Sequence, residues 1–486
     1  MTMQTPSLNF TPRGFYIGGR WVEPAEGKSF ASINPSNMET LAEVPIAGDV
    51  DVDTAVQAAK AAFKDWSRVP IKERACCLEL LADRIENNAD ALALIDAVDS
   101  GNAIVGMRGD MIWTAEWLRY CAGLVTEIKG ETIPMGEGVL DYSLREPYGV
   151  VARIVAYNHP LMFVAGKMAP PLAAGNAVIM KPPYQAPLSS YRLMEILEGI
   201  FPPGVANIVT AGQPGSQALV AHPHVPRLSL IGSVPTGRAI AKAAAERLKH
   251  VTLELGGKNA CVIYPDADLE RAAAGAVNGM NFTWCGQSCG STSRLFIHDA
   301  VYDRVMAMVL ERVQHYRPGI PTDPATTMGA IVSKAQLDKI LSYIEIAKGE
   351  GAVLACGGKR PPDASLARGW FVEPTIFTGV TQDMRIANEE VFGPVLAVLR
   401  WSDEEAMFEQ VNRVEYGLTG SVWTTSLANA HRAAARIESG FIWVNHAGPH
   451  FMGVSFGGYK QSGIGREEGS DEILGFTQHK NVHIVL

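Results

Sequence analysis

Apolar and polar residues follow two different periods along the chain, and these periods divide it into elements. Between residues 14 and 50, short apolar runs separated by Gly and Pro predict strands and turns. From Asp51 an Ala-rich helical period begins, and a second helix is predicted from about Ile71 to Asp99, because apolar residues recur on one face of each. Both helices are interpreted as scaffold.

A hairpin interrupts this helical region. Residues 128–133 and 139–144 read as strands joined by the turn 134–138. A hairpin that stands off a domain leaves strand edges to be covered, and a partner subunit is one candidate. At the end of the chain, alternating Val482, Ile484 and Leu486 predict a further strand that needs an edge to pair with.

From Gly149 onward, strands and helices alternate, which predicts a doubly wound parallel sheet with ligands at the carboxyl ends of its strands. The expected strands are 149–156, 177–180, 206–210, 228–231, 251–255 and 261–264, and the expected helices are 161–174, 189–197 and 236–248. A second α/β region is predicted from Arg294 to about Thr424, with a strand at 294–297 and helices at 299–313 and 333–348.

Length and charge narrow the class of protein. A chain of 486 residues is long enough for two or three domains with large cores. The net charge of −9 argues against a nucleic-acid partner or an anionic membrane surface. The most apolar region, 150–180, is broken by charges and prolines, so no membrane span is expected, and the start of the chain does not look like a secretion signal.

The seven cysteines form no disulfide spacing, which favours a reducing compartment and a cytoplasmic protein. Cys285 and Cys289 are four residues apart, but no second pair or suitably spaced His accompanies them, so no metal is expected. Cys289 lies between small residues, in Gly286-Gln-Ser-Cys-Gly-Ser-Thr292, as a nucleophile with room for a substrate would. A buried, inert thiol is the commoner outcome for such a segment taken alone.

Polar residues at the ends of the predicted parallel strands are Asn158, Lys181, Gly232-Ser233 and Glu254. Asn158 and Ser233 have a simpler alternative role as helix caps, and Lys181 as a solvated strand end. Glu254 is different, because a carboxylate in an apolar strand either pairs with a cation or has a raised pKa suited to a base. The usual Gly-x-Gly-x-x-Gly dinucleotide fingerprint is absent after the strands.

With these residues in view, the chain resembles the aldehyde dehydrogenase superfamily over nearly its full length. The motifs are Glu254-Leu-Gly-Gly-Lys258, Gly286-Gln-Ser-Cys289 and Glu390-Val-Phe-Gly-Pro394, in the family's order. The resemblance implies an α/β fold with a variant Rossmann cofactor domain (1–122 and 148–256), a catalytic α/β domain (257–455) and β oligomerisation elements (123–147 and 456–486). It also implies a homodimer or homotetramer.

The resemblance further implies a reaction. Cys289 attacks the aldehyde carbon, the amide of Asn158 and the backbone N–H of Cys289 stabilise the oxyanion, and hydride passes to NAD or NADP. Glu254 then activates water to hydrolyse the thioester, which separates hydrolytic members from those that acylate coenzyme A.

The cofactor contacts implied by the resemblance are Lys181, Tyr184, Gly232, Ser233, Gly256, Glu390 and Phe392. Tyr184 stands where NAD-preferring members often carry Glu, so the carboxylate that would repel a 2′-phosphate is missing and NADP is admitted as well as NAD.

The substrate pocket is expected to contain His159, Met162, Phe163, Thr283, His450, Phe451 and Phe456. His159, Trp284 and Cys285 depart from the family's usual pattern, and the mixture carries no fixed Arg or Lys. An uncharged, apolar or aromatic aldehyde is therefore expected. Two rival functions are a cysteine-dependent esterase and a non-catalytic binding protein on the same fold.

Overall fold

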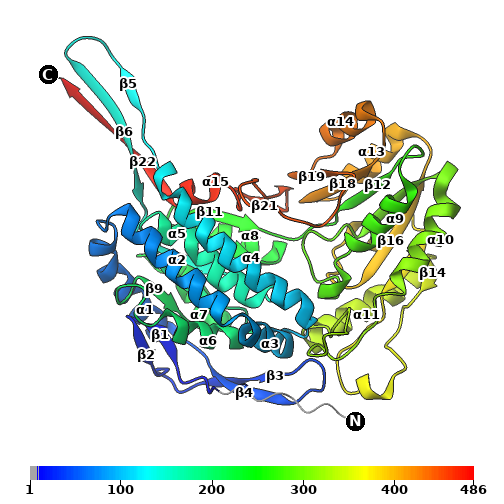
Figure 1. Cartoon of the computed structure of the whole chain (residues 1–486), viewed down its shortest axis with the longest axis horizontal. Coiled ribbons are helices and arrows are strands. Elements are labelled where there is room, and N and C mark those ends of the chain that lie inside the picture. The colour runs from blue at the N-terminus through cyan, green and yellow to red at the C-terminus, as the bar shows by residue number, and fades with distance from the viewer. Residues whose placement is uncertain (1–7, 9, 486) are drawn as a thin grey trace.

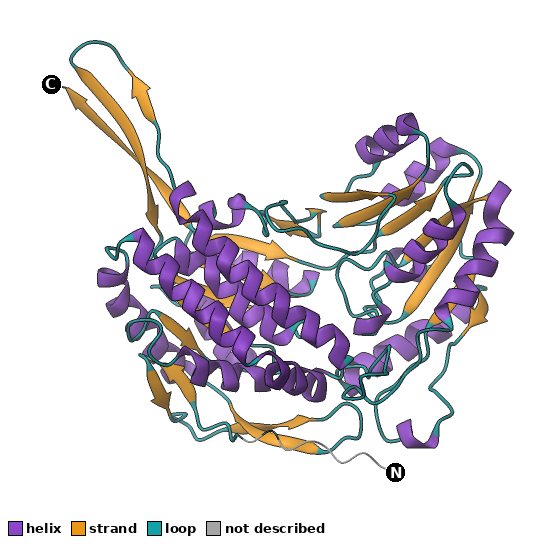
Figure 2. Cartoon of the chain, in the orientation of Figure 1, coloured by secondary structure: helices purple, strands orange, loops and turns teal. Residues whose placement is uncertain are grey.

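The computed structural model describes residue 8 and residues 10–485. Two lobes, each with its own sheet, lie side by side, and a long arm projects from the first lobe (Figure 1). Helices and strands alternate in both lobes, which confirms the α/β class predicted from the sequence (Figure 2).

The first lobe is built on an eight-stranded sheet whose centre is parallel. Its central strands carry side chains that are almost all buried, as expected where helices cover both faces of a parallel sheet. In spatial order the strands are β2 (Arg20–Val22), β1 (Phe15–Ile17), β9 (Ala206–Ile208), β8 (Ala177–Lys181), β7 (Val150–Ile154), β10 (Arg227–Ile231), β11 (His250–Glu254) and β21 (Gly463–Ile464). A separate hairpin joins β3 (Ser29–Ile33) to β4 (Thr40–Pro45).

Helices pack around this sheet, and one predicted boundary is wrong. The single helix expected over 71–99 is two helices separated by Asn88. Asn88 leaves the helical conformation (φ −113°, ψ 11°), and its side-chain amide donates to the carbonyl of Arg84 at 2.8 Å, so it closes one helix before the next begins. The helices of this lobe are α1 (Asp49–Trp66), α2 (Ile71–Asn87), α3 (Ala89–Ser100), α4 (Ile104–Gly123), α6 (Leu188–Leu197), α7 (Gln213–Ala221) and α8 (Val234–Ala245).

The helix predicted over 161–174 is present but irregular. Its first part, Met162–Gly166, is a π-helix, and α5 (Lys167–Ala173) continues it. Pro170 and Pro171 lie in α5 and have no N–H to offer the preceding turn, so regular α-helical bonding cannot run through the segment.

The second lobe carries a seven-stranded sheet, parallel except at one edge. It extends past the predicted end near Thr424, because β19 pairs in parallel with β18. Its strands, in spatial order, are β14 (Val353–Cys356), β15 (Thr375–Thr378), β16 (Val395–Trp401), β13 (Arg294–His298), β12 (Ala260–Ile263), β18 (Thr419–Trp423) and β19 (Phe441–Val444). The helices are α9 (Leu269–Asn278), α10 (Tyr302–Val313), α11 (Lys334–Gly349), α12 (Arg385–Asn388), α13 (Glu404–Asn412) and α14 (Leu427–Arg436).

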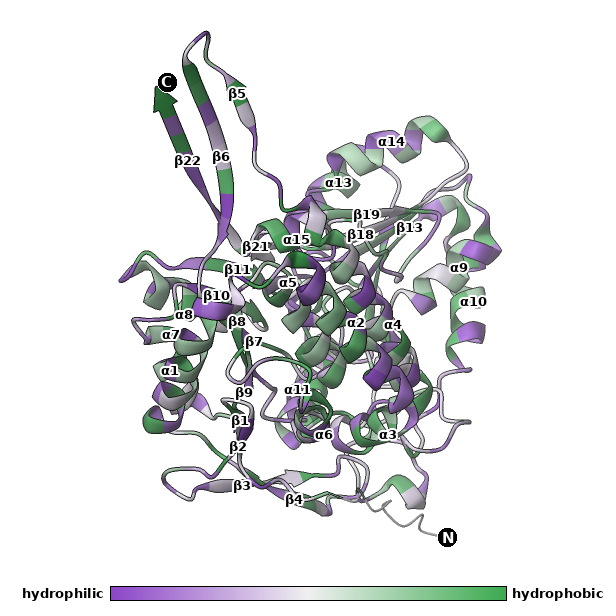
Figure 3. Cartoon of the chain, turned by 60° about the vertical axis from the view of Figure 1, so that its left-hand side comes forward, coloured by the Kyte–Doolittle hydropathy of each residue, from purple (hydrophilic) through white to green (hydrophobic). Residues whose placement is uncertain are grey.

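The arm is a three-stranded antiparallel sheet of β5 (Thr132–Pro134), β6 (Val139–Pro147) and β22 (Thr477–Val485). The predicted terminal strand thus finds its edge on β6, with apolar positions near the tip (Figure 3). The first hairpin strand starts later than the expected residue 128, because pairing with β6 begins only at Thr132. Leu486 lies outside the described residues.

Candidate active site

Cys289 lies in a tightly held loop between α9 and β13. The backbone of Asn281 and Cys285 is left-handed (φ 52° and 56°), which coils the loop on itself. The side-chain amide of Asn259 donates to the carbonyl oxygens of Cys289 at 2.7 Å and Ser291 at 2.9 Å. The loop is therefore fixed to the start of β12.

Burial raises the pKa of the Cys289 thiol to about 12, and the carboxylates of Glu254, Glu390 and Glu468 add to this effect. The thiol must therefore lose its proton before its sulfur can act as a nucleophile. Cys285 is fully buried, and its thiol lies 3.4 Å from the carbonyl oxygen of Ala330, as in a packing contact.

Glu254 ends β11 and is 5% exposed. Neither of its carboxylate oxygens has a hydrogen-bond partner among the described residues. Burial, together with the nearby carboxylate of Glu467, raises its pKa well above the usual range. Of the two alternatives for an acid in this strand, the structure has the unpaired one with a raised pKa.

Asn158 follows β7 and is 3% exposed. Its carbonyl oxygen accepts a hydrogen bond from the side-chain amide of Asn102 at 2.9 Å, which holds the backbone of Asn158 in place. A helix-capping role is filled by another residue, because the N–H of Leu161 donates to the carboxylate of Asp96 at 3.1 Å. The Asn158 side chain instead borders the same cavity as Cys289 and Glu254.

This cavity has a volume of about 420 Å³. It brings together the three expected catalytic residues and five of the expected pocket residues. Thr283 is not on its wall, since its methyl group faces Gly106 of α4, and Phe451 is not on it either. The lining residues are Gly109, Asp110, Trp113, Asn158, His159, Met162, Phe163, Lys167, Ile231, Glu254, Asn278, Asn281, Trp284, Ser288, Cys289, Ala447, Gly448, Pro449, His450, Phe456, Glu467 and Glu468.

Sequence reasoning missed the contribution of α4. Gly109, Asp110 and Trp113 reach the cavity from this helix, although it lies far from the motifs in sequence. Asp110 and Trp113 are three apart and so share a helix face, but nothing in the sequence says what that face meets.

Two histidines on the cavity wall are each held by a carboxylate. The Nδ1 of His159 is 2.8 Å from Asp110 Oδ2, and the Nδ1 of His450 is 2.8 Å from Glu468 Oε2. The His159 ring lies edge-on to Phe163 at 5.2 Å, and the His450 ring lies 4.4 Å from that of Phe456.

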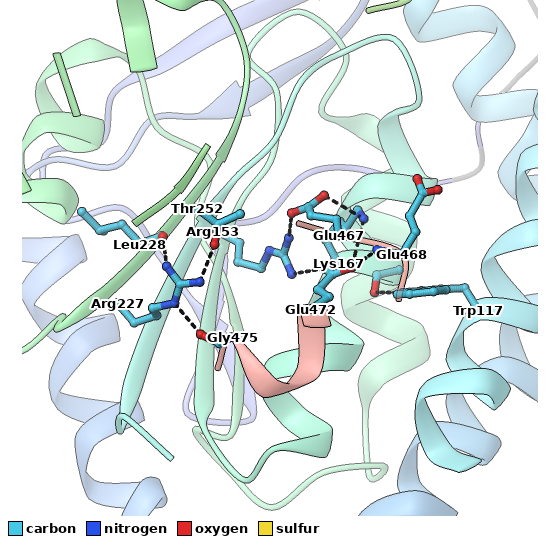
Figure 4. A network of polar contacts seen from close by, with 11 residues as sticks. Trp117, Arg153, Lys167, Arg227, Leu228, Thr252, Glu467, Glu468, Glu472 and Gly475 are labelled. Atoms are coloured by element: carbon cyan, nitrogen blue, oxygen red, sulfur yellow. Dashed lines mark hydrogen bonds and ion pairs between the residues drawn. The ribbon is translucent and has the colours of Figure 1, made fainter. Parts of the chain in front are cut away.

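At the wall of the cavity, a buried ionic network joins β7 and α5 to the C-terminal segment (Figure 4). Arg153 donates to Glu467 and, at 2.8 Å, to Glu472 of α15 (Ser470–Leu474), and Lys167 Nζ is 2.8 Å from Glu467 Oε2. Burial opposes the charge of Lys167, but Glu467 and Glu472 outweigh it and raise its pKa. Burial likewise opposes ionisation of Glu467, yet Lys167 and Arg153 lower its pKa. Two cations therefore balance two carboxylates.

The residues expected on the cofactor side divide into two groups. At the end of β8, Lys181 is 9% exposed, and burial lowers its pKa to about 8. No hydrogen bond or ion pair joins its ammonium group to another described residue, so it is available to a ligand's oxygen atoms. Tyr184 is 44% exposed and stacks on Phe30 at 3.9 Å. Ser233 occupies the N-cap position of α8, next to Gly232, so this helix presents free N–H groups to an anion.

Glu390 and Phe392 lie nearer to the thiol. The N–H of Gly257 donates to Glu390 Oε1 at 2.9 Å, and a Cβ on Gly256 would lie 2.3 Å from Glu390 Oε2. Phe392 has left-handed backbone (φ 57°) and lies edge-on to Tyr157 at 5.8 Å. A buried cation, a helix N-terminus and a carboxylate near the thiol fit the pyrophosphate and riboses of a dinucleotide.

None of the helices in the described part of the chain has the length and apolarity needed to cross a bilayer. Within residues 8 and 10–485, no three His, Cys, Asp or Glu side chains gather as metal ligands would.

Comparisons with known proteins show the family of this chain. Residues 21–482 match the model of the aldehyde dehydrogenase family. The aldehyde dehydrogenase tropH of Talaromyces stipitatus is 47% identical over 97% of this chain and 93% of its own length. A putative aldehyde dehydrogenase from Burkholderia cenocepacia has a TM-score of 0.96 at 40% identity, covering 98% of both chains. AldA of P. syringae, an indole-3-acetaldehyde dehydrogenase solved with NAD+ and IAA, has a TM-score of 0.96 at 35% identity, covering 99% of this chain and 98% of that one. The chain belongs to the aldehyde dehydrogenase family, and it is an NAD(P)-dependent oxidoreductase that converts an aldehyde to a carboxylic acid.

Proposed function

We propose that this enzyme oxidises an uncharged, apolar or aromatic aldehyde, with Cys289 as nucleophile, Asn158 as oxyanion donor and Glu254 as the base for hydrolysis. The observation that carries the proposal is that one cavity holds all three side chains between aromatic walls. The walls include Trp113, Phe163 and Phe456, which suit a planar apolar group. The one lysine on the wall, Lys167, is already paired with Glu467.

Each step uses one of these groups. After the Cys289 thiol has lost its proton, the thiolate sulfur bonds to the aldehyde carbon, and the oxygen that becomes an oxyanion is stabilised by the Asn158 amide and the Cys289 N–H. NAD or NADP, held by Lys181, Ser233 and Glu390, would supply the hydride acceptor for that carbon, and loss of the hydride would leave a thioester on Cys289. Glu254, as carboxylate, takes a proton from water as the water attacks the thioester, and the acid and the thiol are released.

Lys181, Ser233 and Gly232 are proposed to hold the adenosine and pyrophosphate of NAD or NADP, and Glu390 and Phe392 to position the nicotinamide half. Gly256 supports this role because only a residue without a side chain leaves room for the Glu390 carboxylate. Tyr184 places no negative charge beside the adenosine ribose, so both dinucleotides are proposed to bind.

The proposed domains are 1–122 with 148–256 for the cofactor, 257–455 for catalysis, and 123–147 with 456–486 for assembly into a homodimer or homotetramer. Leu140 and Leu144 are 38% and 42% exposed on the arm, which supports a role in assembly. The free state of all seven cysteines supports a cytoplasmic location.

Reduction of NAD or NADP, followed at 340 nm, tests the proposal with benzaldehyde and succinic semialdehyde. We expect kcat/KM to favour benzaldehyde and Cys289→Ala to abolish turnover. Equal kcat/KM for the two aldehydes would remove the substrate assignment. Ester hydrolysis that proceeds without dinucleotide, while no aldehyde reduces it, would favour the esterase alternative.

A further inference from the structure

Two imidazole–carboxylate pairs on the cavity wall indicate which chemical groups the substrate carries. His159 with Asp110 and His450 with Glu468 all line the cavity, whose remaining wall is largely aromatic and apolar. The proposed reaction assigns no role to either histidine. Paired imidazoles facing an apolar cavity are therefore a feature that the reaction chemistry alone leaves unexplained.

The carboxylates fix which ring nitrogen carries the proton. In the neutral form of each imidazole, the Nδ1 that faces the carboxylate is the donor, because an ionised carboxylate can only accept. The Nε2 of each ring is then left with a lone pair that accepts hydrogen bonds. Neither Nε2 has a hydrogen-bond partner among the described residues, while the two side chains are 17% and 31% exposed. An acceptor without a partner on the wall of a cavity is free to accept a hydrogen bond from a donor on the molecule that fills the cavity.

Both rings lie close to the reacting centre. His159 directly follows Asn158, and its ring lies 5.3 Å from that of Trp284. The Nε2 of His450 is 3.9 Å from the position that a Cβ would occupy on Gly290, the residue after Cys289. Both imidazoles therefore line the cavity that an aldehyde bound to the thiol would occupy.

The negative charges of Asp110 and Glu468 indicate which kind of hydrogen-bond donor the substrate carries. Asp110 and Glu468 line the cavity beside the imidazoles, so a substrate carboxylate or phosphate would meet like charge. An uncharged hydroxyl meets no such repulsion and donates one hydrogen bond. We propose that the substrate is an aromatic aldehyde bearing a hydroxyl group, and that the Nε2 of His159 or His450 accepts a hydrogen bond from it. This inference rests on the proposed function and narrows its substrate class.

The test compares benzaldehyde with its hydroxy-, methoxy- and carboxy-substituted forms at each ring position. A methoxy group keeps the oxygen but cannot donate. We expect at least one hydroxybenzaldehyde to exceed both benzaldehyde and its own methoxy isomer roughly five- to tenfold in kcat/KM, the size of one net hydrogen bond. The carboxybenzaldehydes are expected to be the poorest substrates.

His159→Phe and His450→Phe are expected to remove the hydroxy-to-methoxy preference in one of the two variants. The preference is a ratio within each protein, so a general loss of activity cancels. His159→Asn and His450→Asn keep an acceptor oxygen and should restore part of it. His431→Phe, on an exposed position of α14, is the matched control and should keep the full preference.

A second measurement avoids dependence on the variants' folding. Phenol has the hydroxyl donor that anisole, its methyl ether, lacks, and neither compound can be oxidised as an aldehyde. Phenol should therefore inhibit benzaldehyde oxidation by the wild-type enzyme more strongly than anisole. Methoxy isomers that match the hydroxy isomers, or a preference that survives both Phe variants, would overturn the inference. Turnover of benzaldehyde itself would still stand in that case, whereas failure of the proposed function would appear as no turnover of any aromatic aldehyde.

Discussion

Gly257 and Cys289 meet where no side chain could fit: a Cβ on Gly257 would lie 2.6 Å from the carbonyl oxygen of Cys289. The glutamate motif and the cysteine motif are thus packed backbone to backbone. This contact and the hydrogen bond from Asn259 to the same carbonyl oxygen fix the backbone of Cys289, and so the position of its thiol in the cavity.

Gly257→Ala is expected to push the cysteine loop away and reduce kcat/KM about 10²-fold, since a displacement of about 1 Å at a reacting atom has that effect. Steady-state kinetics with benzaldehyde would measure it. Gly349→Ala, where an added Cβ meets nothing within 4 Å, is the matched control and should behave like wild type. Normal kinetics in Gly257→Ala would show that the contact does not position the thiol.

Glu254→Gln is expected to give a single-turnover burst of reduced cofactor and then stall, because acylation proceeds but water is not activated. In the wild-type enzyme the pKa of Glu254 is raised, and Glu254 acts as a base only when it is ionised. Hydrolysis of the thioester should therefore slow as the pH falls through that raised pKa. Rapid-mixing absorbance at 340 nm would record both effects. Glu246→Gln, at an exposed position after α8, should show no burst, and a normal steady state in Glu254→Gln would refute the assignment.

Lys167→Met is expected to lower the free energy of unfolding by about 3–5 kcal/mol, because it leaves two buried carboxylates with only Arg153. Since the folded pKa of Glu467 is depressed, the network's stabilisation is present above the carboxyl's unfolded pKa and is lost as pH falls through the folded one. Denaturant unfolding at neutral and acidic pH would measure the difference in free energy of unfolding between wild type and Lys167→Met, and this difference should be smaller at acidic pH. Lys129→Met, in an exposed ion pair with Glu127, should change little.

Tyr184→Glu is expected to weaken NADP binding about tenfold relative to NAD, because a carboxylate there repels the 2′-phosphate by roughly 1–2 kcal/mol. Calorimetric titration of the protein with each dinucleotide measures this without turnover. Tyr184→Gln removes the Phe30 stacking partner without adding charge, so it separates packing from electrostatics. An unchanged ratio of the two affinities would place the 2′-hydroxyl away from residue 184.

Leu144→Arg is expected to dissociate the assembly toward a species of 52.3 kDa, because it puts charge on the exposed apolar side of β6. Light scattering coupled to size exclusion would give the mass. Glu137→Arg, in the exposed hairpin turn, changes charge without touching that surface and should leave the mass unaltered. A wild-type protein that is already monomeric would contradict the proposed assembly.

The sequence by itself determined the elements and the motif residues. Apolar periods placed most strands and helices within a few residues, because periodicity reports local burial. It also singled out Cys289, Glu254 and Asn158 as the residues to inspect. Two predicted helices differ from the structure because individual residues interrupt regular helical hydrogen bonding. Asn88 ends one helix through its own side chain, and the prolines of α5 make the bonding of another irregular.

Only the tertiary structure decided what surrounds the thiol. The sequence placed Thr283 in the pocket, but its methyl group turns toward α4, and Asp110 and Trp113 reach the cavity from that helix instead. The pairing of His450 with Glu468 and the joining of Lys167 to Glu467 depend on chain crossings that no local pattern encodes. Spacing along a helix or strand fixes which residues share a face, whereas the packing of distant segments fixes what that face meets.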